Sequence, residues 1–282
     1  MKVLVTGAGG MLARATRRAL EQAGHEVVGL ERADADVTEL ESLLHPTRSF
    51  QPDWVFHLAA LTKVDDCETQ ADRAHLVNGL GARNAALAAA ANQAAILSIS
   101  TDYVFGGAAR RPYREYDAIA PQSVYGASKW AGEQAVREIH PRHIIVRTSW
   151  LYGRGGPNFP DTILRKARDR EPLKVVNDQR GAPTWTKDLA GALIKLASTD
   201  QYGTYHVTNS GECTWYEFAC YLVARAGIEV SIEPTDSATF ARPAPRPAYS
   251  VLCNLAYEHV TGDRLPHWQD AADRYLKSKE KP

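Results

Sequence analysis

The sequence predicts an α/β fold, with a doubly wound, Rossmann-like parallel sheet and a smaller C-terminal substrate-binding lobe. A short aliphatic run meets the glycine turn Gly7-Ala8-Gly9-Gly10, strand-like and helix-like segments then alternate to about residue 152, and the rest breaks into loops and short elements. Such alternation favours a parallel sheet covered by helices. We therefore assign 1–152 and 183–208 to a dinucleotide-binding domain, and 153–182 and 209–282 to the substrate-binding lobe.

The charge balance and cysteine usage exclude several classes of protein. The 282 residues include 33 basic and 33 acidic side chains, giving a formal net charge of +0, without a basic run. We therefore expect no nucleic-acid partner and no membrane partner. The four cysteines have neither a C-x-x-C pair nor zinc-type spacing. They are typical of reduced thiols, so we expect a cytoplasmic protein without a metal.

The first predicted strand, 2–6, leads through the glycine turn into a helix at 11–23. The spacing is Gly7-x-x-Gly10-x-x-Ala13, with alanine in place of the usual third glycine. Backbone N–H groups at the start of such a helix point at a pyrophosphate. Alanine is small enough to preserve the packing of helix against strand. The turn therefore indicates a nucleotide site, although a glycine turn by itself also simply ends a strand.

The second predicted strand, 25–30, ends at Glu31-Arg32. An acidic residue at this point hydrogen-bonds the adenosine ribose in NAD enzymes, whereas an arginine pairs with the 2′-phosphate of NADP. Both stand side by side here, so the cofactor choice stays open. A capping box, Thr38-x-x-Glu41, predicts the start of the next helix.

Two polar residues in the next predicted elements have open roles. His57 lies in the predicted strand 54–60, and we interpret it as a core histidine because no second ligand-type residue has metal-site spacing from it. Asn78 lies mid-way in a predicted helix, 72–91, where asparagine is a poor helix former. It either has a polar task, such as holding a water or a lysine, or is exposed.

The candidate chemistry lies in the next strand and helix. The strand 94–100 delivers Thr101, and the helix 122–139 carries Tyr125 and Lys129 four residues apart, on one helix face. We expect the ammonium to lower the phenol's pKa from about 10 towards neutrality. The Thr101 hydroxyl would hold a carbonyl oxygen beside the phenol. These groups suit proton transfer at a sugar or alcohol oxygen while hydride moves at the carbon.

The carboxyl ends of the predicted parallel strands define one crevice. The fifth predicted strand spans 142–149. The ends of four predicted strands are occupied by Gly7, Ala59, Thr101 and Trp150. Ligands of doubly wound sheets bind beyond these ends. The remaining predictions are a loop at 153–159, helices at 162–170, 187–197 and 214–227 (capping box Thr214-x-x-Glu217), a helix after Pro266, strands at 173–176 and 203–207, a turn at 179–184 and a proline-rich loop at 242–247.

Together these residues resemble the dTDP-4-dehydrorhamnose reductase family of the extended short-chain dehydrogenase/reductase superfamily, nearly end to end. The segments that carry the resemblance are the Gly7 to Ala13 turn, Ala59-Ala60 with Val64-Asp65, Ser100-Thr101-Asp102-Tyr103-Val104-Phe105, Tyr125 with Lys129, Arg147-Thr148-Ser149-Trp150, Asn158-Phe159, Asp178-Gln179 through Pro183-Thr184, Trp215-Tyr216-Glu217-Phe218-Ala219, and Arg246-Pro247 through Ser250 and Leu252.

The resemblance implies NAD(P)H-dependent reduction of the C4 keto group of dTDP-4-dehydro-6-deoxy-L-mannose to dTDP-L-rhamnose. Tyr125 would donate the proton to the C4 oxygen, Lys129 would lower its pKa and bind the nicotinamide ribose, and Thr101 would hydrogen-bond the same oxygen. NADPH is the expected cofactor, with NADH as the alternative. The implied cofactor contacts are Gly7, Gly10, Met11, Leu12, Glu31, Arg32, Asp36, Val37, Ala59, Ala60, Thr62, Tyr125 and Lys129.

The implied contacts to the nucleotide-sugar substrate come from both predicted parts of the chain. Trp150 has the alternative of being a core or lid aromatic. Arg246 would pair with the substrate diphosphate, or is a solvated loop arginine. The implied substrate contacts are Thr101, Asp102, Tyr103, Trp150, Asn158 and Arg246.

Departures from the family pattern affect the expected metal, the expected oligomeric state and the reactions that remain possible. Ala15 stands where some members carry a magnesium-binding glutamate at a subunit interface, so we expect no such metal and a monomer or weak homodimer. A 4,6-dehydratase would need a glutamate where Tyr103 follows Asp102. The open alternatives are a 4-epimerase, a reductase of another nucleotide-linked 4-ketosugar, a non-catalytic regulatory subunit similar to the methionine adenosyltransferase beta subunit, and a redox-sensing NAD(P)-binding protein.

Overall fold

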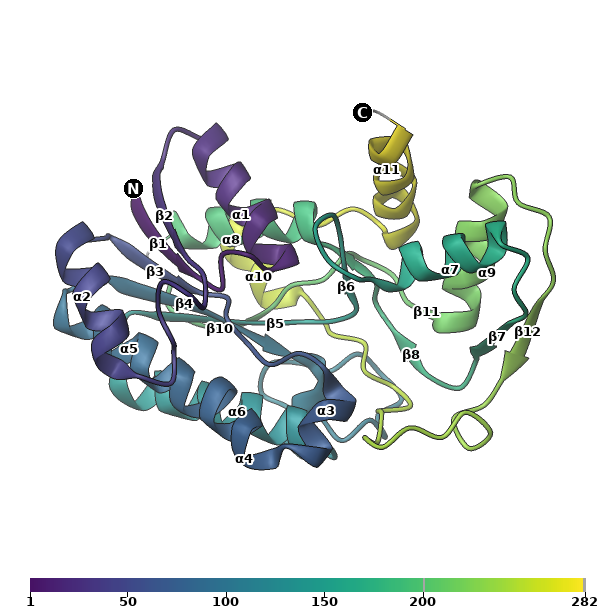
Figure 1. The fold of residues 1–282 in the computed structure, drawn as a ribbon, viewed down its shortest axis with the longest axis horizontal. Coiled ribbons are helices and arrows are strands. Elements are labelled where there is room, and N and C mark those ends of the chain that lie inside the picture. The colour runs from purple at the N-terminus through teal and green to yellow at the C-terminus, as the bar shows by residue number, and fades with distance from the viewer. Residues whose placement is uncertain (200, 281–282) are drawn as a thin grey trace.

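A computed structural model describes residues 1–199 and 201–280, with a six-stranded parallel sheet at its centre (Figure 1). The strand order is β10-β5-β4-β3-β1-β2, and every pairing in this sheet is parallel. This confirms the predicted α/β, doubly wound sheet. The strands are β1 (Lys2–Thr6), β2 (Glu26–Leu30), β3 (Trp54–His57), β4 (Ala95–Thr101), β5 (His143–Thr148) and β10 (Gly203–His206).

Helices cover both faces of the sheet, as Figure 1 shows. One hydrophobic cluster joins the sheet to α1, α8 and α10, and a second joins its other face to α2, α5 and α6. Helix α5 is rich in alanine because most of its residues are buried where it packs against α6. The helices of the two layers are α1 (Met11–Gln22), α8 (Thr186–Ala197), α10 (Leu255–Thr261), α2 (Leu40–Phe50), α5 (Gly81–Ala91) and α6 (Val124–Ile139).

The segment between β3 and α5 differs from the single helix predicted at 72–91. It contains α3 (Val64–Thr69), α4 (Ala71–Ala74) and a π-helical turn at His75–Leu80. Asn78 lies in this turn and is fully buried. Its Oδ1 accepts a hydrogen bond from the Leu61 amide at 2.8 Å, and its Nδ2 donates to the Leu61 carbonyl and to Ser128 Oγ. Asn78 therefore has a polar role, which is to join α6 to the loop after β3.

The predicted capping box at Thr38 is wrong, whereas the one at Thr214 is confirmed. Thr38 donates its hydroxyl to Asp36 Oδ1 at 2.8 Å, and α2 begins only at Leu40, without a side-chain cap. Asp36 Oδ1 also accepts from the Thr38 amide, so Thr38 is held in a turn before the helix. The Thr214 hydroxyl donates to Asn177 Oδ1 and still accepts from the Glu217 amide, so the reciprocal bonds with Glu217 form at the start of α9.

The C-terminal lobe consists of three helices and small two-stranded sheets, to the right in Figure 1. Helix α7 begins three residues before the predicted start at 162, because Asn158 caps it there. The predictions did not include α3, α10, β12 or the two-residue strands. The elements are α7 (Phe159–Arg168), α9 (Trp215–Arg225), α11 (Trp268–Glu280), β6 (Leu151–Tyr152) paired with β9 (Thr184–Trp185), β7 (Leu173–Val176) with β12 (Ile232–Thr235), and β8 (Arg180–Gly181) with β11 (Cys213–Thr214).

The predicted division into two parts remains a prediction. Tyr257 and Leu265 share a hydrophobic cluster with Val3, so part of the C-terminal segment packs on the sheet. Asp200 and residues 281–282 belong to the predicted parts but lie outside the described residues. None of the described helices is long and apolar enough to cross a bilayer.

Candidate active site

A cavity of about 840 Å³ opens at the carboxyl ends of the sheet strands. In the sheet, β2 lies on one side of β1 and β3 lies on the other, so the strand order reverses at β1. The cavity lies at this switch point, which is where doubly wound sheets bind ligands. The structure brings nearly all predicted site residues to this cavity. Those lining it are Gly7, Gly10, Met11, Leu12, Glu31, Arg32, Asp36, Val37, Ala59, Ala60, Thr62, Thr101, Asp102, Tyr103, Tyr125, Lys129 and Trp150.

The glycine turn is shaped for a close backbone approach. Gly7 has φ +68°, and a Cβ added to it would lie 2.7 Å from Ala59 Cα. Gly10 precedes α1 in extended conformation, with no side chain capping the helix. The free N–H groups of the first turn of α1 therefore lie beside the cavity, as a pyrophosphate requires. The residues present fit a dinucleotide.

Glu31 and Arg32 lie differently around this turn. A Cβ added to Gly9 would come within 3.3 Å of the Glu31 carboxyl group, so this side chain extends over the turn. The Arg32 side chain is 77% exposed, and its guanidinium is 3.8 Å from the Asp36 carboxylate. An exposed ion pair this long contributes little stability. Arg32 is therefore free to rearrange towards an anion.

The start of α6 is packed tightly against the turn after β4. Ser123 caps the helix by accepting a hydrogen bond from the Gly126 amide at 3.1 Å. A side chain at position 126 would overlap the Tyr103 carbonyl oxygen, so only glycine permits this approach. The approach brings Tyr125 into hydrogen-bond contact with the Thr101 hydroxyl, and its ring packs edge-on against Tyr103, with centroids 5.8 Å apart.

Lys129 lies one turn further along α6, and its side chain is buried. Within the described residues, no hydrogen bond of its Nζ to another residue is found. Burial lowers the pKa of Lys129 to about 8, against the opposing charge of Glu133. The amine therefore titrates near neutrality and lines the cavity with its donors unused.

The predicted lowering of the Tyr125 pKa is wrong for this structure. Burial raises the pKa of the phenol, the Thr101 hydrogen bond opposes this only in part, and Lys129 has no resolved effect. The physical reason is that removal of the phenolate from water outweighs stabilisation by a lysine that is itself poorly solvated. Tyr125 consequently keeps its proton at neutral pH, which is the state required of an acid.

Asp102 is a buried carboxyl group beside these residues. Only 2% of it is exposed. Thr101 donates its hydroxyl to Asp102 Oδ1 at 3.0 Å, while Oδ2 has no hydrogen-bond partner among the described residues. Burial raises the pKa of Asp102 to about 7, although the hydroxyls of Ser250 and Thr101 favour its charged form.

Trp150 is held in an unusual position at the end of β5. Its φ is +47°, a conformation that side chains rarely adopt, and its indole stacks on Trp215 with ring centroids 3.6 Å apart and planes 7° apart. A Cβ on Gly181 would lie 2.5 Å from Trp150 Cε2. Trp215 also lines the cavity and was not among the predicted site residues. Its place directly after the capping residue Thr214 was the available signal.

Two predicted substrate contacts do not line this cavity. The Asn158 side chain accepts from the Asp161 amide and donates to the Gly153 carbonyl, which caps α7. Arg246 forms a two-point ion pair with Asp65 at 2.7 and 2.9 Å, so it is not the solvated loop arginine of the alternative interpretation. Their roles towards a substrate remain predictions.

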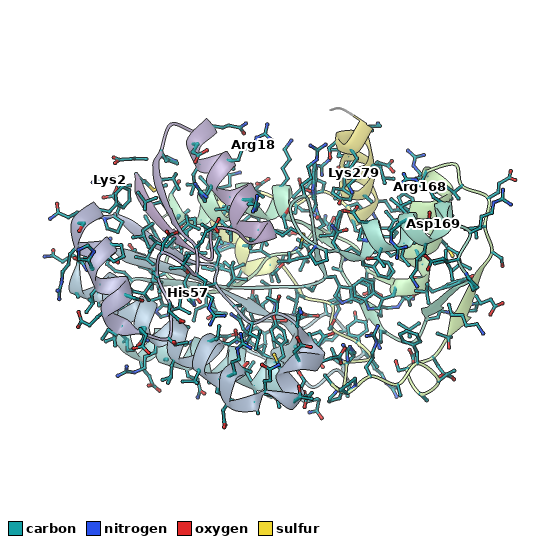
Figure 2. The ribbon with its side chains drawn as sticks, in the orientation of Figure 1. Lys2, Arg18, His57, Arg168, Asp169 and Lys279 are labelled. Carbon is teal, nitrogen blue, oxygen red and sulfur yellow. The ribbon has the colours of Figure 1, made fainter. Side chains whose placement is uncertain are left out.

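His57 lies in the interior of the sheet, whereas Lys2, Arg18, Arg168, Asp169 and Lys279 lie at the periphery (Figure 2). Its Nδ1 is 3.0 Å from Thr6 Oγ1, and its Nε2 has no hydrogen-bond partner within the described part. Burial, together with the nearby Lys129, lowers the pKa of His57 to about 3, so the ring is neutral. No cluster of three or more metal-ligating side chains occurs among the described residues.

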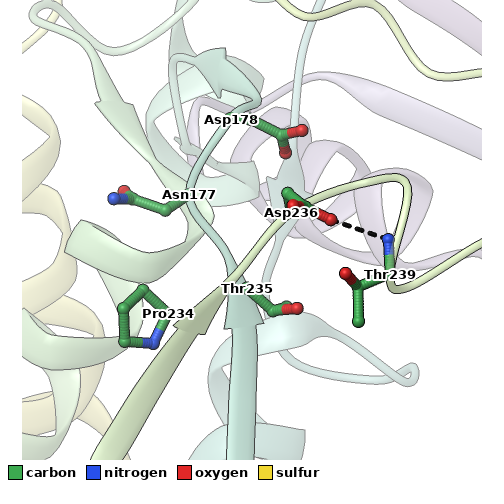
Figure 3. A pocket seen from close by; sticks show the side chains of 6 residues that line it. All are labelled: Asn177, Asp178, Pro234, Thr235, Asp236 and Thr239. Atoms are coloured by element: carbon green, nitrogen blue, oxygen red, sulfur yellow. Dashed lines mark hydrogen bonds between the residues drawn. The ribbon is translucent and has the colours of Figure 1, made fainter.

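A second hollow lies beyond the ends of β7 and β12 (Figure 3). Its polar groups serve the local turns: Asp236 accepts from the Thr239 amide, Asp178 accepts from Ser237, and Asn177 accepts from the Thr214 hydroxyl. These bonds leave few groups for a ligand, so the larger cavity is the candidate active site. The hollow is lined by Asn177, Asp178, Pro234, Thr235, Asp236 and Thr239.

A family model described as the RmlD substrate binding domain matches residues 1–280. The chain belongs to this family. Among RmlD-family relatives, a spore coat polysaccharide biosynthesis protein, SpsK, of Bacillus subtilis is 46% identical, covering 99% of this chain and 98% of its own. A dTDP-4-dehydrorhamnose reductase of Streptomyces griseus is 42% identical, over 95% and 90%. A dTDP-4-keto-6-deoxy-D-glucose reductase of Streptomyces niveus is 38% identical, over 95% and 94%.

A solved structure extends this RmlD-family relationship to three dimensions. The dTDP-4-dehydrorhamnose reductase of Bacillus anthracis, crystallised in complex with NADP, superposes with a TM-score of 0.96 at 38% identity. The match covers 98% of this chain and 99% of that one. The fold is therefore shared over nearly the whole chain with a protein crystallised in complex with NADP.

Proposed function

We propose that the chain reduces the C4 keto group of dTDP-4-dehydro-6-deoxy-L-mannose, using NADPH, to form dTDP-L-rhamnose. The chain is an NAD(P)-dependent oxidoreductase of the RmlD family, which acts on a nucleotide sugar. The single observation that carries the proposal is the convergence of Thr101, Tyr125 and Lys129 with the Gly7 turn on one cavity.

Each of these side chains has a defined task in the reduction. Bound NADPH supplies hydride to C4. Tyr125, which burial keeps protonated, donates its proton to the C4 oxygen as negative charge develops there. Thr101 orients this oxygen through its hydroxyl. Lys129 binds the nicotinamide ribose through its unused donors.

The cofactor preference follows from the two side chains that end β2. Arg32 is exposed and weakly paired, so it can turn to a 2′-phosphate, which supports NADPH. Glu31 lies over the glycine turn, where a carboxylate accepts hydrogen bonds from unmodified ribose hydroxyls. We therefore propose NADPH as the cofactor with NADH as a usable alternative.

The substrate contacts are proposed among the residues that line the cavity. Asp102, Tyr103 and Trp150 are three of these, and they would contact the sugar. Arg246 would bind the diphosphate after breaking its ion pair with Asp65. Asn158 acts on the substrate only indirectly in this proposal, by holding the start of α7. We also propose a monomer or weak homodimer in the cytoplasm.

A second candidate is reduction of a different dTDP-linked 4-ketosugar. The Streptomyces niveus relative, named for the D-glucose-configured ketosugar, supports this alternative. A purely regulatory role is disfavoured because the three catalytic side chains are all present around an open cavity.

The test follows NADPH oxidation with each of the two 4-ketosugars, identifying the product by NMR. We expect turnover with dTDP-4-dehydro-6-deoxy-L-mannose and dTDP-L-rhamnose as product. Turnover of only the D-configured ketosugar selects the second candidate. Binding of NADPH without turnover of either sugar rejects both reductase proposals, and capture of a stoichiometric partner enzyme would then support the regulatory alternative.

A further inference from the structure

A proton donor that is used in every turnover must regain its proton after each reduction. The side chains around Tyr125 indicate where this proton comes from. After reduction, Tyr125 is left as a phenolate in a site that disfavours this charge. A return route through the lysine side of the site would need a polar residue beside Lys129. Asn78, for which the sequence predicts a possible role in holding a lysine or a water, directs its amide to Leu61 and Ser128 instead. Asn78 therefore offers no such route.

Such a route exists on the opposite side of Tyr125. The Thr101 hydroxyl contacts the phenol and also donates to Asp102 Oδ1 at 3.0 Å. Thr101 thus links the phenol to a buried carboxyl group. The backbone N–H of Tyr103 donates to Thr101 Oγ1 at 3.2 Å and holds the hydroxyl in this place.

Asp102 has the surroundings of a group that exchanges a proton. It lines the cavity, is 2% exposed, and its Oδ2 has no hydrogen-bond partner among the described residues. A buried carboxylate oxygen without a partner is costly, and protonation removes that cost. The ionisable groups around it are Tyr103 and Tyr125 and, next to Tyr103, the ion pair of Asp65 with Arg246. None of these gives Asp102 a direct cationic partner.

We propose that Asp102 stores the proton that recharges Tyr125, delivered through the hydroxyl of Thr101. This inference rests on the proposed reduction. When Asp102 carries its proton on Oδ1, this proton is donated to Thr101 Oγ1, and the Thr101 hydroxyl turns from Asp102 to donate to the Tyr125 phenolate oxygen. The Thr101 O–H bond then breaks as its hydrogen passes to the phenolate, and Thr101 Oγ1 simultaneously takes the proton from Asp102 Oδ1. Phenol and hydroxyl are restored, and Asp102 is left as a carboxylate. Water in the open cavity returns one proton to Asp102 before the next turnover.

The direct test measures Asp102 without any substrate. Infrared difference titration of the free protein should contain a carboxylic-acid band that disappears as pH rises through about 7 and is absent from Asp102→Asn. Asp169→Asn, at an exposed carboxylate on the far lobe, is the matched control and should keep the band. Identical titrations of wild type and Asp102→Asn would overturn the proposal, whatever the outcome for the reaction.

The kinetic test separates the first turnover from later ones. With enzyme in excess, the rate at which Asp102→Asn oxidises the first equivalent of NADPH serves as the reference for this variant, because Tyr125 starts protonated and any loss of sugar binding is already included. At saturating ketosugar the steady-state rate of Asp102→Asn should lie about tenfold or more below this reference and lose the wild-type decline above pH 7, whereas the two wild-type rates should agree below pH 7. An unchanged steady-state rate and pH profile would overturn the proposal. Absence of wild-type turnover would instead reject the proposed function.

A third measurement needs no variant, in case Asp102→Asn does not fold. In wild type, NADPH oxidation should show a burst of one equivalent per site about one pH unit above 7, where Asp102 is discharged, and none about one unit below. A burst independent of pH contradicts the proton store.

Discussion

Glu133 on α6 and Arg147 on β5 form a two-point ion pair that is closed off from solvent, with 1% of each side chain exposed. The pair adjoins the candidate active site. Ser100, the neighbour of Thr101, donates to Glu133 Oε1 at 2.6 Å, and Glu133 follows Lys129 by one turn of α6. It therefore joins β4, β5 and α6 at the level of the active site.

Glu133→Gln should destabilise the fold by about 3–5 kcal/mol, because Arg147 would remain buried without its counter-charge. Equilibrium unfolding in urea measures this. Glu138→Gln, on the exposed face of the same helix, should change the free energy of unfolding by less than about 0.5 kcal/mol. Equal effects of the two substitutions on the free energy of unfolding would mean that the buried ion pair contributes no specific stability.

If Tyr125 is the proton donor, as proposed, Tyr125→Phe should lower kcat by about two to four decades. NADPH affinity, measured by fluorescence titration, should stay nearly unchanged because the proposed contact of the phenol is to the sugar oxygen and not to the pyrophosphate. Near-wild-type turnover in this variant would remove Tyr125 from the mechanism.

Gly181→Ala should displace Trp150, since the new methyl group would lie 2.5 Å from Trp150 Cε2. We expect a loss of about 1–3 kcal/mol in stability, a changed near-UV circular dichroism of the Trp150–Trp215 stack, and a lower kcat/KM for the ketosugar. Gly191→Ala, in α8 with open space around it, is the control and should be neutral or slightly stabilising. An unaltered dichroism in Gly181→Ala would contradict the predicted packing.

His57 should contribute to acid denaturation. Its folded-state pKa of about 3 lies below the unfolded value of 6.5, so the stability from a neutral His57 is complete above pH 6.5 and is lost as pH falls towards 3. The slope is at most about 1.4 kcal/mol per pH unit. His57→Gln should flatten this part of the stability profile, measured by thermal melting, while His45→Gln at an exposed site should not. Parallel profiles for both variants would exclude His57 as a cause.

The sequence predicted the nucleotide part of the fold well, because its signals are local. The Gly7 turn, the buried strands and the Tyr125–Lys129 spacing each depend on a few neighbouring residues. The failures depend on competition or on distant parts of the chain. Thr38 bonds Asp36 instead of capping a helix, and Asn78 lies in a π-helical turn. The pKa of Tyr125 depends on how completely the fold removes water, which no local pattern contains.

The hydrophobic cluster that joins Val3 to Tyr257 and Leu265 affects how the chain folds during its synthesis. During synthesis, β1 leaves the ribosome long before its last packing partners exist, and β10 must pair with β5 before that face of the sheet is covered. Contacts this far apart in sequence form slowly. We therefore expect nascent chains that end before α10 to expose apolar sheet surface and to depend on chaperones.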